Sequence, residues 1–157
     1  VDGDGVPDIY VSDWQHAALG PSTGRVYLYS GKTGRRLLRL TGETAGEGFG
    51  TTHASAGDID GDGHADLAVG SWQYGGAAVS GGRVILYSGK SGKPLATYTC
   101  RIAGDTFGFD AVGIGDVDGD GIDDLLITSG WSAVSGHHSG RVFIVSSGVK
   151  KIARPKP

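Results

Sequence analysis

Residues 58–66 read Asp-Ile-Asp-Gly-Asp-Gly-His-Ala-Asp, and this acidic stretch decides the fold because it recurs along the chain. Its Asp-Gly-Asp-Gly segment, residues 60–63, appears again at residues 2–5 and 118–121, so the copies stand at one constant interval. Self-similarity at a fixed period of this size is typical of proteins built from repeated supersecondary units. The chain of 157 residues is therefore predicted to form one domain of repeated units.

Two further landmarks keep the same register. Gly-Arg-Val at residues 24–26 recurs at residues 82–84 and 140–142, and Phe-Gly at residues 49–50 recurs at residues 107–108. The interval is the same in every case, so three independent landmarks share one period. The chain therefore contains two complete copies and one incomplete copy of a 58-residue unit.

Each unit shows the pattern of short β-strands. In the second unit, apolar, β-branched and aromatic residues fill four segments, at residues 51–57, 67–71, 83–87 and 94–100. Gly, Asp and Ser residues of the kind found in tight turns separate them. No segment shows a 3.6-residue apolar period, which predicts an all-β fold. Four antiparallel strands per unit is the make-up of a β-propeller blade.

The unit boundaries predict how the single repeat domain, residues 1–157, is divided. Residues 1–48 form an incomplete blade that lacks its first strand, and residues 49–106 form a complete blade. Residues 107–157 form a third blade, whose last strand would fall in a basic, Pro-containing tail. These two and a half to three blades are fewer than the roughly four to eight of a closed propeller. The expected fold is an incomplete propeller, either a piece of a longer one or one completed by neighbouring chains at its open strand edges.

The Asp-rich loops predict metal sites, because hard Ca²⁺ prefers roughly six to eight oxygen ligands. Carboxylates stand at positions 1, 3, 5 and 9 of the loop, a main-chain carbonyl is available at position 7, and glycines at positions 4 and 6 permit the turn. The expected ligands are Asp58, Asp60, Asp62, the His64 carbonyl and Asp66 in the second loop; Asp116, Asp118, Asp120, the Ile122 carbonyl and Asp124 in the third; and Asp2, Asp4, the Val6 carbonyl and Asp8 in the first, which lacks its position-1 Asp. The chain is thus expected to hold up to three Ca²⁺, one per loop.

Other interpretations of the loops fit less well. Zinc prefers His and Cys side chains, and Mg²⁺ retains several waters. An EF-hand needs a Glu at position 12 of its loop between two helices, but position 12 here is Val69 or Ile127 within a strand-like run. A simple hairpin turn needs only one or two such residues, so four repeated carboxylates favour a cation site.

Two other residue series follow the repeat. Trp14, Trp72 and Trp131 each open the Gly/Ser/Ala-rich connection that leads to the third strand, at the end of the blade opposite the acidic loop. Such tryptophans either form a ligand-binding surface for a sugar or a protein or fill the seam between blades. The series Arg25, Arg83 and Arg141 begins each third strand, and is expected to make an ion pair or to donate to a loop carbonyl.

Several functional classes have no support in the composition. No apolar run approaches the roughly 20 residues of a membrane-spanning helix, so no membrane insertion is expected. The formal net charge is −3 and no concentrated basic patch is evident, which argues against nucleic-acid binding. Cys100 is the single cysteine, so no internal disulfide can form. The chain has no Gly-x-Ser-x-Gly, phosphate-loop or His-Glu-x-x-His motif, and it is predicted not to be an enzyme.

A family resemblance rests on these same motifs. Phe-Gly, a strand, and then Gly-Asp-Ile-Asp-Gly-Asp-Gly-His-Ala-Asp-Leu-Ala-Val-Gly at residues 57–70 resemble the FG-GAP repeat of integrin α-subunit propellers and of many bacterial secreted proteins. The resemblance implies a β-propeller with Ca²⁺ in the hairpin that joins the first two strands of a blade. It also implies an extracellular or cell-surface protein with a role in adhesion or ligand binding. In place of a Gly-Ala-Pro element, this chain has residues 12–14, 70–72 and 129–131, each ending in Trp.

Three functions are compatible with this pattern. The first is a secreted or cell-surface, calcium-stabilised propeller module that binds an extracellular protein or glycan. The second is a structural subunit that assembles with copies of itself into a ring or filament through its incomplete end blades. The third is a non-catalytic region of a larger secreted enzyme that acts on polysaccharides.

Overall fold

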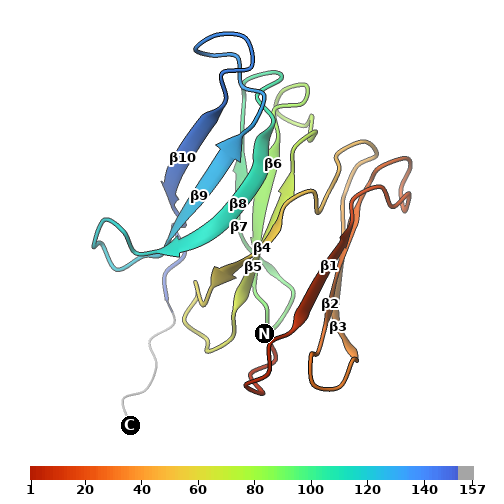
Figure 1. Ribbon diagram of the computed structural model, residues 1–157, viewed down its shortest axis with the longest axis vertical. Helices are drawn as coiled ribbons and strands as arrows, with labels where there is room; N and C mark the ends of the chain where they lie inside the picture. The colour runs from red at the N-terminus through yellow and green to blue at the C-terminus, as the bar shows by residue number, and fades with distance from the viewer. Residues whose placement is uncertain (152–157) are drawn as a thin grey trace.

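Ten strands in three antiparallel sheets make up the described part of the chain, residues 1–151 of a computed structural model. The first sheet contains β1 (Ile9–Asp13), β2 (Arg25–Tyr29) and β3 (Arg36–Thr41); the middle sheet β4 (His53–Gly57), β5 (Asp66–Ser71), β6 (Arg83–Tyr87) and β7 (Pro94–Thr99); and the third sheet β8 (Phe107–Gly115), β9 (Asp124–Ser129) and β10 (Arg141–Ser146). The sheets stand side by side (Figure 1). The predicted all-β, blade-like fold of an incomplete propeller is confirmed.

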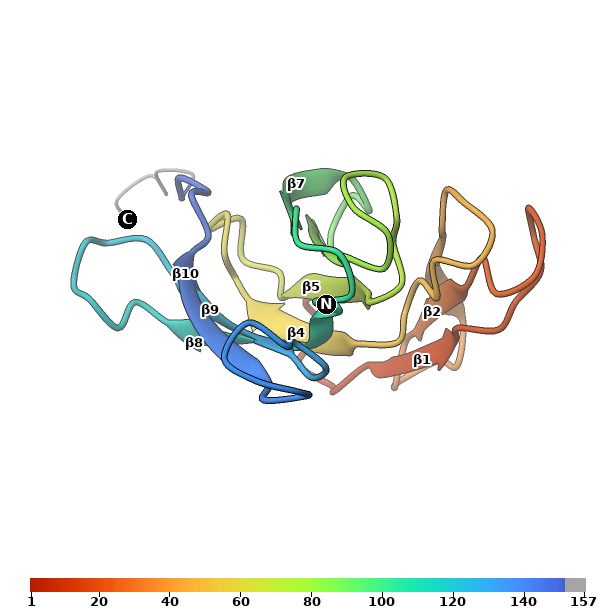
Figure 2. The same cartoon turned by 90° about the horizontal axis from the view of Figure 1, so that it is seen from above.

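Within each sheet the strands follow one another in chain order. The middle sheet has the order β4-β5-β6-β7, the first has β1-β2-β3, and the third has β10-β9-β8. Seen from above, β1, β4 and β8 lie along one side of the row and β7 on the opposite side (Figure 2). The first sheet therefore starts with the equivalent of β5, as expected for a unit without its first strand. The exact division into units at residues 48 and 106 stays a prediction.

The fourth strand expected for the third unit does not form within the described residues. Residues 147–151 contain no strand, and residues 152–157 of the predicted strand lie outside the described part. The segment after β10 has one apolar residue, Val149, that packs against the sheet. The lysines that follow favour solvent, and Lys151 instead pairs with Asp123 at 2.9 Å. Residues 1–151 contain no helix that is long and apolar enough to cross a membrane.

Two separate cores lie between the sheets, because the middle sheet is covered on both faces. Alternate residues of a strand point to opposite faces. On β5, Leu67 and Val69 join a core with the first sheet, whereas Ala68 joins a core with the third sheet. Every residue of β5 is buried as a result. This explains why β5 and β6 read as nearly continuous apolar runs without polar alternation.

The Phe-Gly segments form the seams between sheets. Phe49 makes an isolated parallel bridge to Gly24, and Phe107 makes the same bridge to Gly82. Both phenylalanines are buried. A Cβ added to Gly82 would lie 2.0 Å from the carbonyl oxygen of Phe107, so only glycine allows this main-chain approach. The Phe-Gly signature thus encodes the contact of one sheet with the preceding one.

An ion pair with a fully buried carboxylate lies at each seam. The Arg83 guanidinium at the start of β6 lies 2.7 Å from the Glu47 carboxylate and 2.6 Å from the Glu43 carboxylate. Arg141, at the same position of the next unit, lies 2.7 Å from Asp105. Glu47 and Asp105 each precede Phe-Gly by two positions, so the pair repeats with the period of the sequence. The predicted ion pairs of the arginine series are therefore present for Arg83 and Arg141.

Electrostatics support the pair in both seams. Burial would lower the pKa of Arg83, but its bond to Glu43 and the charges of Glu47 and Glu43 raise it overall. Burial would likewise raise the pKa of Asp105, but hydrogen bonds from surrounding side chains, including Arg141 and Ser129, lower it. Arg83 and Asp105 therefore stay ionised near neutral pH. Arg25, in the first sheet, donates instead to the hydroxyl of Thr41 at 3.0 Å.

Removing the Glu47 carboxylate should destabilise the protein strongly. Glu47→Ala leaves the buried Arg83 guanidinium without its buried partner, which typically costs about 3–5 kcal/mol of the free energy of unfolding. Glu43→Ala is the matched control, because its side chain is 64% exposed and an exposed pair contributes at most about 1 kcal/mol. Urea unfolding of both variants checks this difference. Equal destabilisation by the two substitutions would contradict a buried ion pair at the seam.

Candidate metal centre

The acidic loops lie at one end of the sheets. The second loop joins β4 to β5, the third joins β8 to β9, and the first precedes β1. The tryptophan-bearing connections leave the opposite ends of the same strands (Figure 1). The two predicted features of each unit are therefore separated by the length of a strand.

All three loops adopt the same turn. The position-3 carboxylate accepts from the main-chain N–H two residues later, and the position-5 carboxylate does the same. In the second loop these bonds are 3.0 Å, from Asp62 to Asp60, and 2.9 Å, from His64 to Asp62. Gly61 and Gly63 have φ of 76° and 94°, which L side chains rarely adopt. The glycine spacing thus allows successive carboxylates to turn inward.

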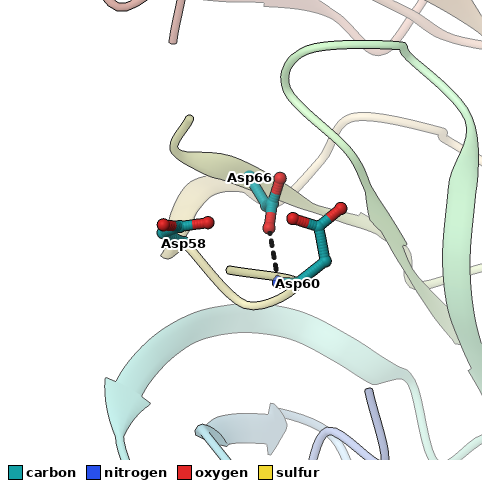
Figure 3. A group of neighbouring side chains, drawn as sticks. All are labelled: Asp58, Asp60 and Asp66. Atoms are coloured by element: carbon teal, nitrogen blue, oxygen red, sulfur yellow. Dashed lines mark hydrogen bonds between the residues drawn. The ribbon is translucent and has the colours of Figure 1, made fainter. Parts of the chain in front are cut away.

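Three carboxylates of the second loop come together. Oxygens of Asp58, Asp60 and Asp66 lie within 4.8 Å of one another. Figure 3 shows these carboxyl groups close together above the loop, with Asp66 accepting a hydrogen bond of 3.3 Å from the main-chain N–H of Asp60. Asp60 and Asp66 are buried. Their arrangement supplies only oxygen ligands, which suits a hard divalent cation.

Asp66 shows that clustering and burial disfavour the charged form of a carboxylate in this loop. Its carboxylate accepts main-chain N–H bonds from Ile59 at 2.8 Å and Gly89 at 3.0 Å. Burial nevertheless raises the pKa of Asp66, and the nearby charge of Asp60 raises it further. A bound cation would offset both effects because it neutralises the cluster.

The third loop has a similar but more exposed group. Asp116, Asp118 and Asp120 bring their oxygens within 4.8 Å of one another, and all three are exposed. The Asp116 carboxylate also accepts from the main-chain N–H of Gly119 and of Gly121, each at 2.8 Å. The loop is therefore preformed by its own backbone, with more solvent around it than the second loop.

The first loop is organised differently. Its Asp8 lies 2.8 Å from the main-chain nitrogen of Val1 and accepts from Gly31 at 3.1 Å. Burial would raise the pKa of Asp8, but these bonds lower it. Asp2, Asp4 and Asp8 do not form a three-carboxylate group like those of the other loops.

The remaining predicted ligands lie beside these groups. Asp62 is 3.9 Å from the Lys90 ammonium and outside the group of three in the second loop, and Asp124 is outside the group in the third. Asp124 accepts from the N–H of Val117 at 2.9 Å. The carbonyls of Val6, His64 and Ile122 stay predicted ligands.

Sequence reasoning missed a second role of the position-9 Asp. Its carboxylate also accepts a hydrogen bond from the main chain of a neighbouring turn. Asp8 accepts from the main-chain N–H of Gly31, and Asp66 accepts from that of Gly89. Gly31 and Gly89 occupy equivalent turns of successive units. Their shared place in the repeat was the signal that could have revealed this contact.

Comparison with known proteins agrees with this geometry. The family model described as FG-GAP-like repeat matches residues 1–69, and that described as FG-GAP repeat matches residues 109–145, together more than half of the chain. The chain belongs to the FG-GAP repeat family. The 58-residue unit, its Phe-Gly seam and its acidic hairpin are thus the features of an FG-GAP repeat in this chain.

Curated relatives of this FG-GAP chain include integrin α subunits. Integrin alpha-4 of Xenopus laevis is 30% identical over 139 residues, which cover 81% of this chain and 13% of the relative. Integrin alpha-IIb of Homo sapiens is 34% identical over 115 residues, which cover 66% of this chain and 11% of the relative. The chain therefore spans a small part of the length of the relatives it matches.

The tryptophans of the FG-GAP units occupy different environments. Trp72 lies in the seam between the middle and third sheets. Its ring centroid is 5.1 Å from that of Trp131 and 5.8 Å from that of Phe109. Trp131 is 50% exposed and stacks on His138 at 6.0 Å, and Trp14 is 40% exposed. Trp72 thus fits a seam residue, whereas Trp131 and Trp14 present ring surface to solvent. A ligand-binding role for the three stays a prediction.

Cation binding should reverse the effect of a carboxylate substitution. Without a divalent cation, Asp60→Asn should raise the melting temperature, because it removes one of three clustered charges. With millimolar Ca²⁺ it should lower the melting temperature relative to wild type, because one site is weakened; a site occupied at about 100 times its Kd stabilises by about 2.7 kcal/mol. Calorimetry in chelator and in Ca²⁺ measures both. Asp13→Asn, an exposed carboxylate outside the loops, is the control.

Two outcomes of this experiment would count against a cation site. A wild-type melting temperature that is the same in excess chelator and in Ca²⁺ would show that no cation stabilises the fold. A destabilisation by Asp60→Asn that is equal in both conditions would assign the carboxylate a purely internal hydrogen-bonding role.

Proposed function

We propose that the chain is a calcium-stabilised FG-GAP module of an extracellular or cell-surface protein, which binds a protein or glycan partner and does not catalyse a reaction. The observation that carries the proposal is the carboxylate cluster, which is present in the second and third hairpins. These hairpins belong to sheets that are joined at the Phe-Gly seams. Similarity to integrin α subunits supports the extracellular setting. The oxygen-only ligand set favours Ca²⁺ over zinc.

The proposed calcium is structural. The second loop contacts two neighbouring segments. Asp66 accepts a hydrogen bond from the main-chain N–H of Gly89, and Nδ1 of His64 lies 2.5 Å from the carbonyl oxygen of Val1. A cation in this loop would therefore stabilise the β4–β5 hairpin, the turn before β7 and the first seam together. Metal affinity of this kind contributes directly to the free energy of unfolding.

The proposed partner surface lies at the other end of the sheets. Rigid scaffolds commonly present binding residues on loops, and exposed tryptophans are frequent centres of interfaces. Trp131 and Val134 are 50% and 56% exposed in one connection, and Trp14 and Leu19 are 40% and 63% exposed in the equivalent one. These four exposed apolar side chains would supply contact area for a partner.

Binding should depend on Trp131 and on calcium. Wild-type protein in millimolar Ca²⁺ is expected to bind at least one member of a glycan array or of an array of secreted and cell-surface ectodomains. Trp131→Ala should weaken that binding about tenfold or more, as expected for an interface hot spot of about 1.4 kcal/mol or more. Ile144→Ser, on the outer face of β10 and outside these connections, is the control for loss of exposed apolar surface. Turnover of a polysaccharide by this chain would contradict the proposal, as would binding that is unchanged in Trp131→Ala.

Self-assembly is a second candidate, favoured by the outer faces of the end sheets. Val142 and Ile144 are 66% and 65% exposed on β10, although their equivalents in the middle sheet, Val84 and Leu86, are fully buried against the third sheet. Ile9 and Val11 are exposed on β1, where the middle sheet buries Leu67 and Val69. The two outer faces therefore match the two sides of a seam and could join head to tail.

Light scattering tests this second candidate. Head-to-tail association predicts a solution mass that is a multiple of 16.1 kDa and that falls to 16.1 kDa in Ile144→Asp. Val79→Asp, at a 77% exposed position in a connection, is the matched control and should leave the mass unchanged. The mass of a single chain for the wild type at all concentrations would contradict self-assembly.

A further inference from the structure

The hairpin formed by β2 and β3 carries a group of exposed cations, which we call the basic hairpin. Its members make up half of residues 32–39: Lys32, Arg35, Arg36 and Arg39. No acidic residue occurs in residues 24–42. Within residues 1–151, none of the four side chains takes part in an ion pair or lies over an aromatic ring. Their charges therefore face solvent without a partner from the described part of the chain.

Two of these arginines share one face of the first sheet. Arg39 is opposite Tyr27 and Arg36 is opposite Tyr29, because the pairing shifts between Leu28 and Tyr29. The two tyrosines are two positions apart on one strand, so they and their cross-strand partners point to the same face. Arg36 and Arg39 therefore stand about 7 Å apart along β3, which is within the Debye length of about 10 Å at 0.1 M salt. Their charges repel each other, and no carboxylate of the hairpin offsets this repulsion.

The fold does not require arginine at these positions. The equivalents of Arg36 and Arg39 in the middle sheet are Pro94 and Thr97, which are uncharged in the same kind of strand. Pro94 and Thr97 are exposed, although Ile85 on that face of the middle sheet is buried against the first sheet. The outermost strand of a sheet thus stays exposed even where a preceding sheet covers the strands beside it. The exposure of the two arginines follows from their place in the blade.

The turn between β6 and β7 extends the basic surface. A Cβ added at Gly92 would lie 3.1 Å from a side-chain carbon of Leu38 on β3, so this turn packs beside the basic hairpin. Lys90 and Lys93 lie in or next to the turn and are both exposed. Cations therefore flank β3 on both of its faces. Sequence reasoning could not reveal this concentration of charge, because it cannot place the turns of successive units side by side.

A sulfated polysaccharide fits this surface better than a membrane or a nucleic acid. None of the exposed large apolar side chains of the described residues lies in residues 30–41 or 88–99. A membrane-surface site inserts apolar side chains, and a site for single-stranded nucleic acid stacks bases on aromatic ones. A linear chain of sulfated sugars needs neither, because its fixed anionic groups pair with exposed guanidinium and ammonium groups.

We infer that the basic hairpin and the neighbouring β6–β7 turn bind a sulfated polysaccharide along the outer edge of β3. Within residues 1–151, β3 pairs only with β2, so a linear polyanion can follow its other edge. The basic hairpin turns at the end of the sheets that carries the acidic loops, away from the tryptophan-bearing connections (Figure 1). The site is therefore separate from the partner surface proposed above. An extracellular source for the polysaccharide rests on the proposed function, whereas binding of the polyanion does not.

The neighbouring acidic loops should make this binding depend on calcium. Asp8 accepts a hydrogen bond of 3.1 Å from Gly31 in the basic hairpin, and Asp62 lies 3.9 Å from Lys90. Carboxylates without a cation would repel a polyanion and compete for Lys90, whereas a bound cation would neutralise them. Affinity for the polysaccharide should therefore be higher in Ca²⁺ than in chelator. This part rests on the proposed cation binding.

Dextran sulfate is the probe, and uncharged dextran of the same length is its control. Isothermal titration calorimetry of the whole chain in millimolar Ca²⁺ should detect binding of dextran sulfate and none of dextran. The affinity should fall as salt is added, because the Debye length shortens from about 10 Å at 0.1 M to about 3 Å at 1 M. The same titration in chelator measures the contribution of the acidic loops.

Substitution of the two arginines tests the surface itself. Arg36→Gln and Arg39→Gln should each weaken dextran sulfate binding about threefold, and the double variant about tenfold, or about 1.4 kcal/mol. Arg101→Gln is the matched control, because it removes one exposed charge outside both hairpins and should leave the affinity unchanged. All of these side chains are exposed, so the melting temperatures should equal that of the wild type.

Several results would overturn the inference. Dextran sulfate binding that is unaffected by the double variant would exclude the basic hairpin, and equal weakening by Arg101→Gln would reduce the effect to net charge. Tighter binding to phosphatidylserine vesicles or to single-stranded DNA would overturn the assignment to a polysaccharide. A larger solution mass of the double variant, with binding intact, would assign the arginines to protection of the β3 edge against strand pairing.

The calcium part has its own outcome. Equal affinity for dextran sulfate in Ca²⁺ and in chelator, together with a melting temperature that Ca²⁺ raises, would overturn the calcium dependence of polysaccharide binding. Failure of the proposed cation binding would instead appear as a wild-type melting temperature that is the same in chelator and in Ca²⁺. Loss of affinity in the double variant under both conditions would support the polysaccharide site in either case.

Discussion

The close approach of each Phe-Gly segment to the preceding sheet is the contact on which the rest of the molecule depends. At the second seam the main chain of Phe107 bridges to Gly82, at a separation that excludes any side chain on the glycine. The ring of Phe107 is buried in the core behind this bridge. Because the contact is between main chains, it fixes the distance between neighbouring sheets independently of the surrounding side chains.

The ion pair across the seam follows from that spacing. The segment that enters the Phe-Gly contact carries Glu47 or Asp105 two positions earlier. This carboxylate pairs with Arg83 or Arg141, which begins the third strand of the sheet that follows the segment. A buried pair of this kind contributes specificity of register more than net stability, because both charges lose water. In this protein we interpret the ion pair as the contact that fixes a single position of each sheet against the next.

The acidic hairpins use the same seams for support. In the second loop Asp60 is buried, whereas its equivalent in the end sheet, Asp118, is exposed; the position-9 carboxylates, Asp66 and Asp124, are buried in both loops. One sequence motif therefore has two electrostatic environments, decided by whether a neighbouring sheet covers it. The middle loop is the one in which a divalent cation would change the free energy of unfolding most.

Much of this could be predicted from sequence because the repeat carries redundant information. The strands around Val69 and Val84, the hairpin position of Asp58 and the incomplete first unit all follow from one 58-residue period. The partners of Arg83 and the bond between Asp66 and Gly89 could not be predicted, because they join segments that no local pattern connects. A signal for the ion pair does exist in the acidic residue two places before each Phe-Gly. For Trp72 the sequence left two alternatives open, a ligand surface or a seam, because its position depends on Trp131 of the next unit, which turn patterns cannot place.

Diffraction from crystals grown in millimolar Ca²⁺, with anomalous data, shows whether the acidic loops hold a structural cation. A structural cation predicts an anomalous peak between Asp58, Asp60 and Asp66 with oxygen ligands at roughly 2.3–2.6 Å, and a second peak in the third loop. An empty second loop at saturating Ca²⁺, with its carboxylates still clustered, would contradict the account, because internal hydrogen bonds alone would then hold the hairpin.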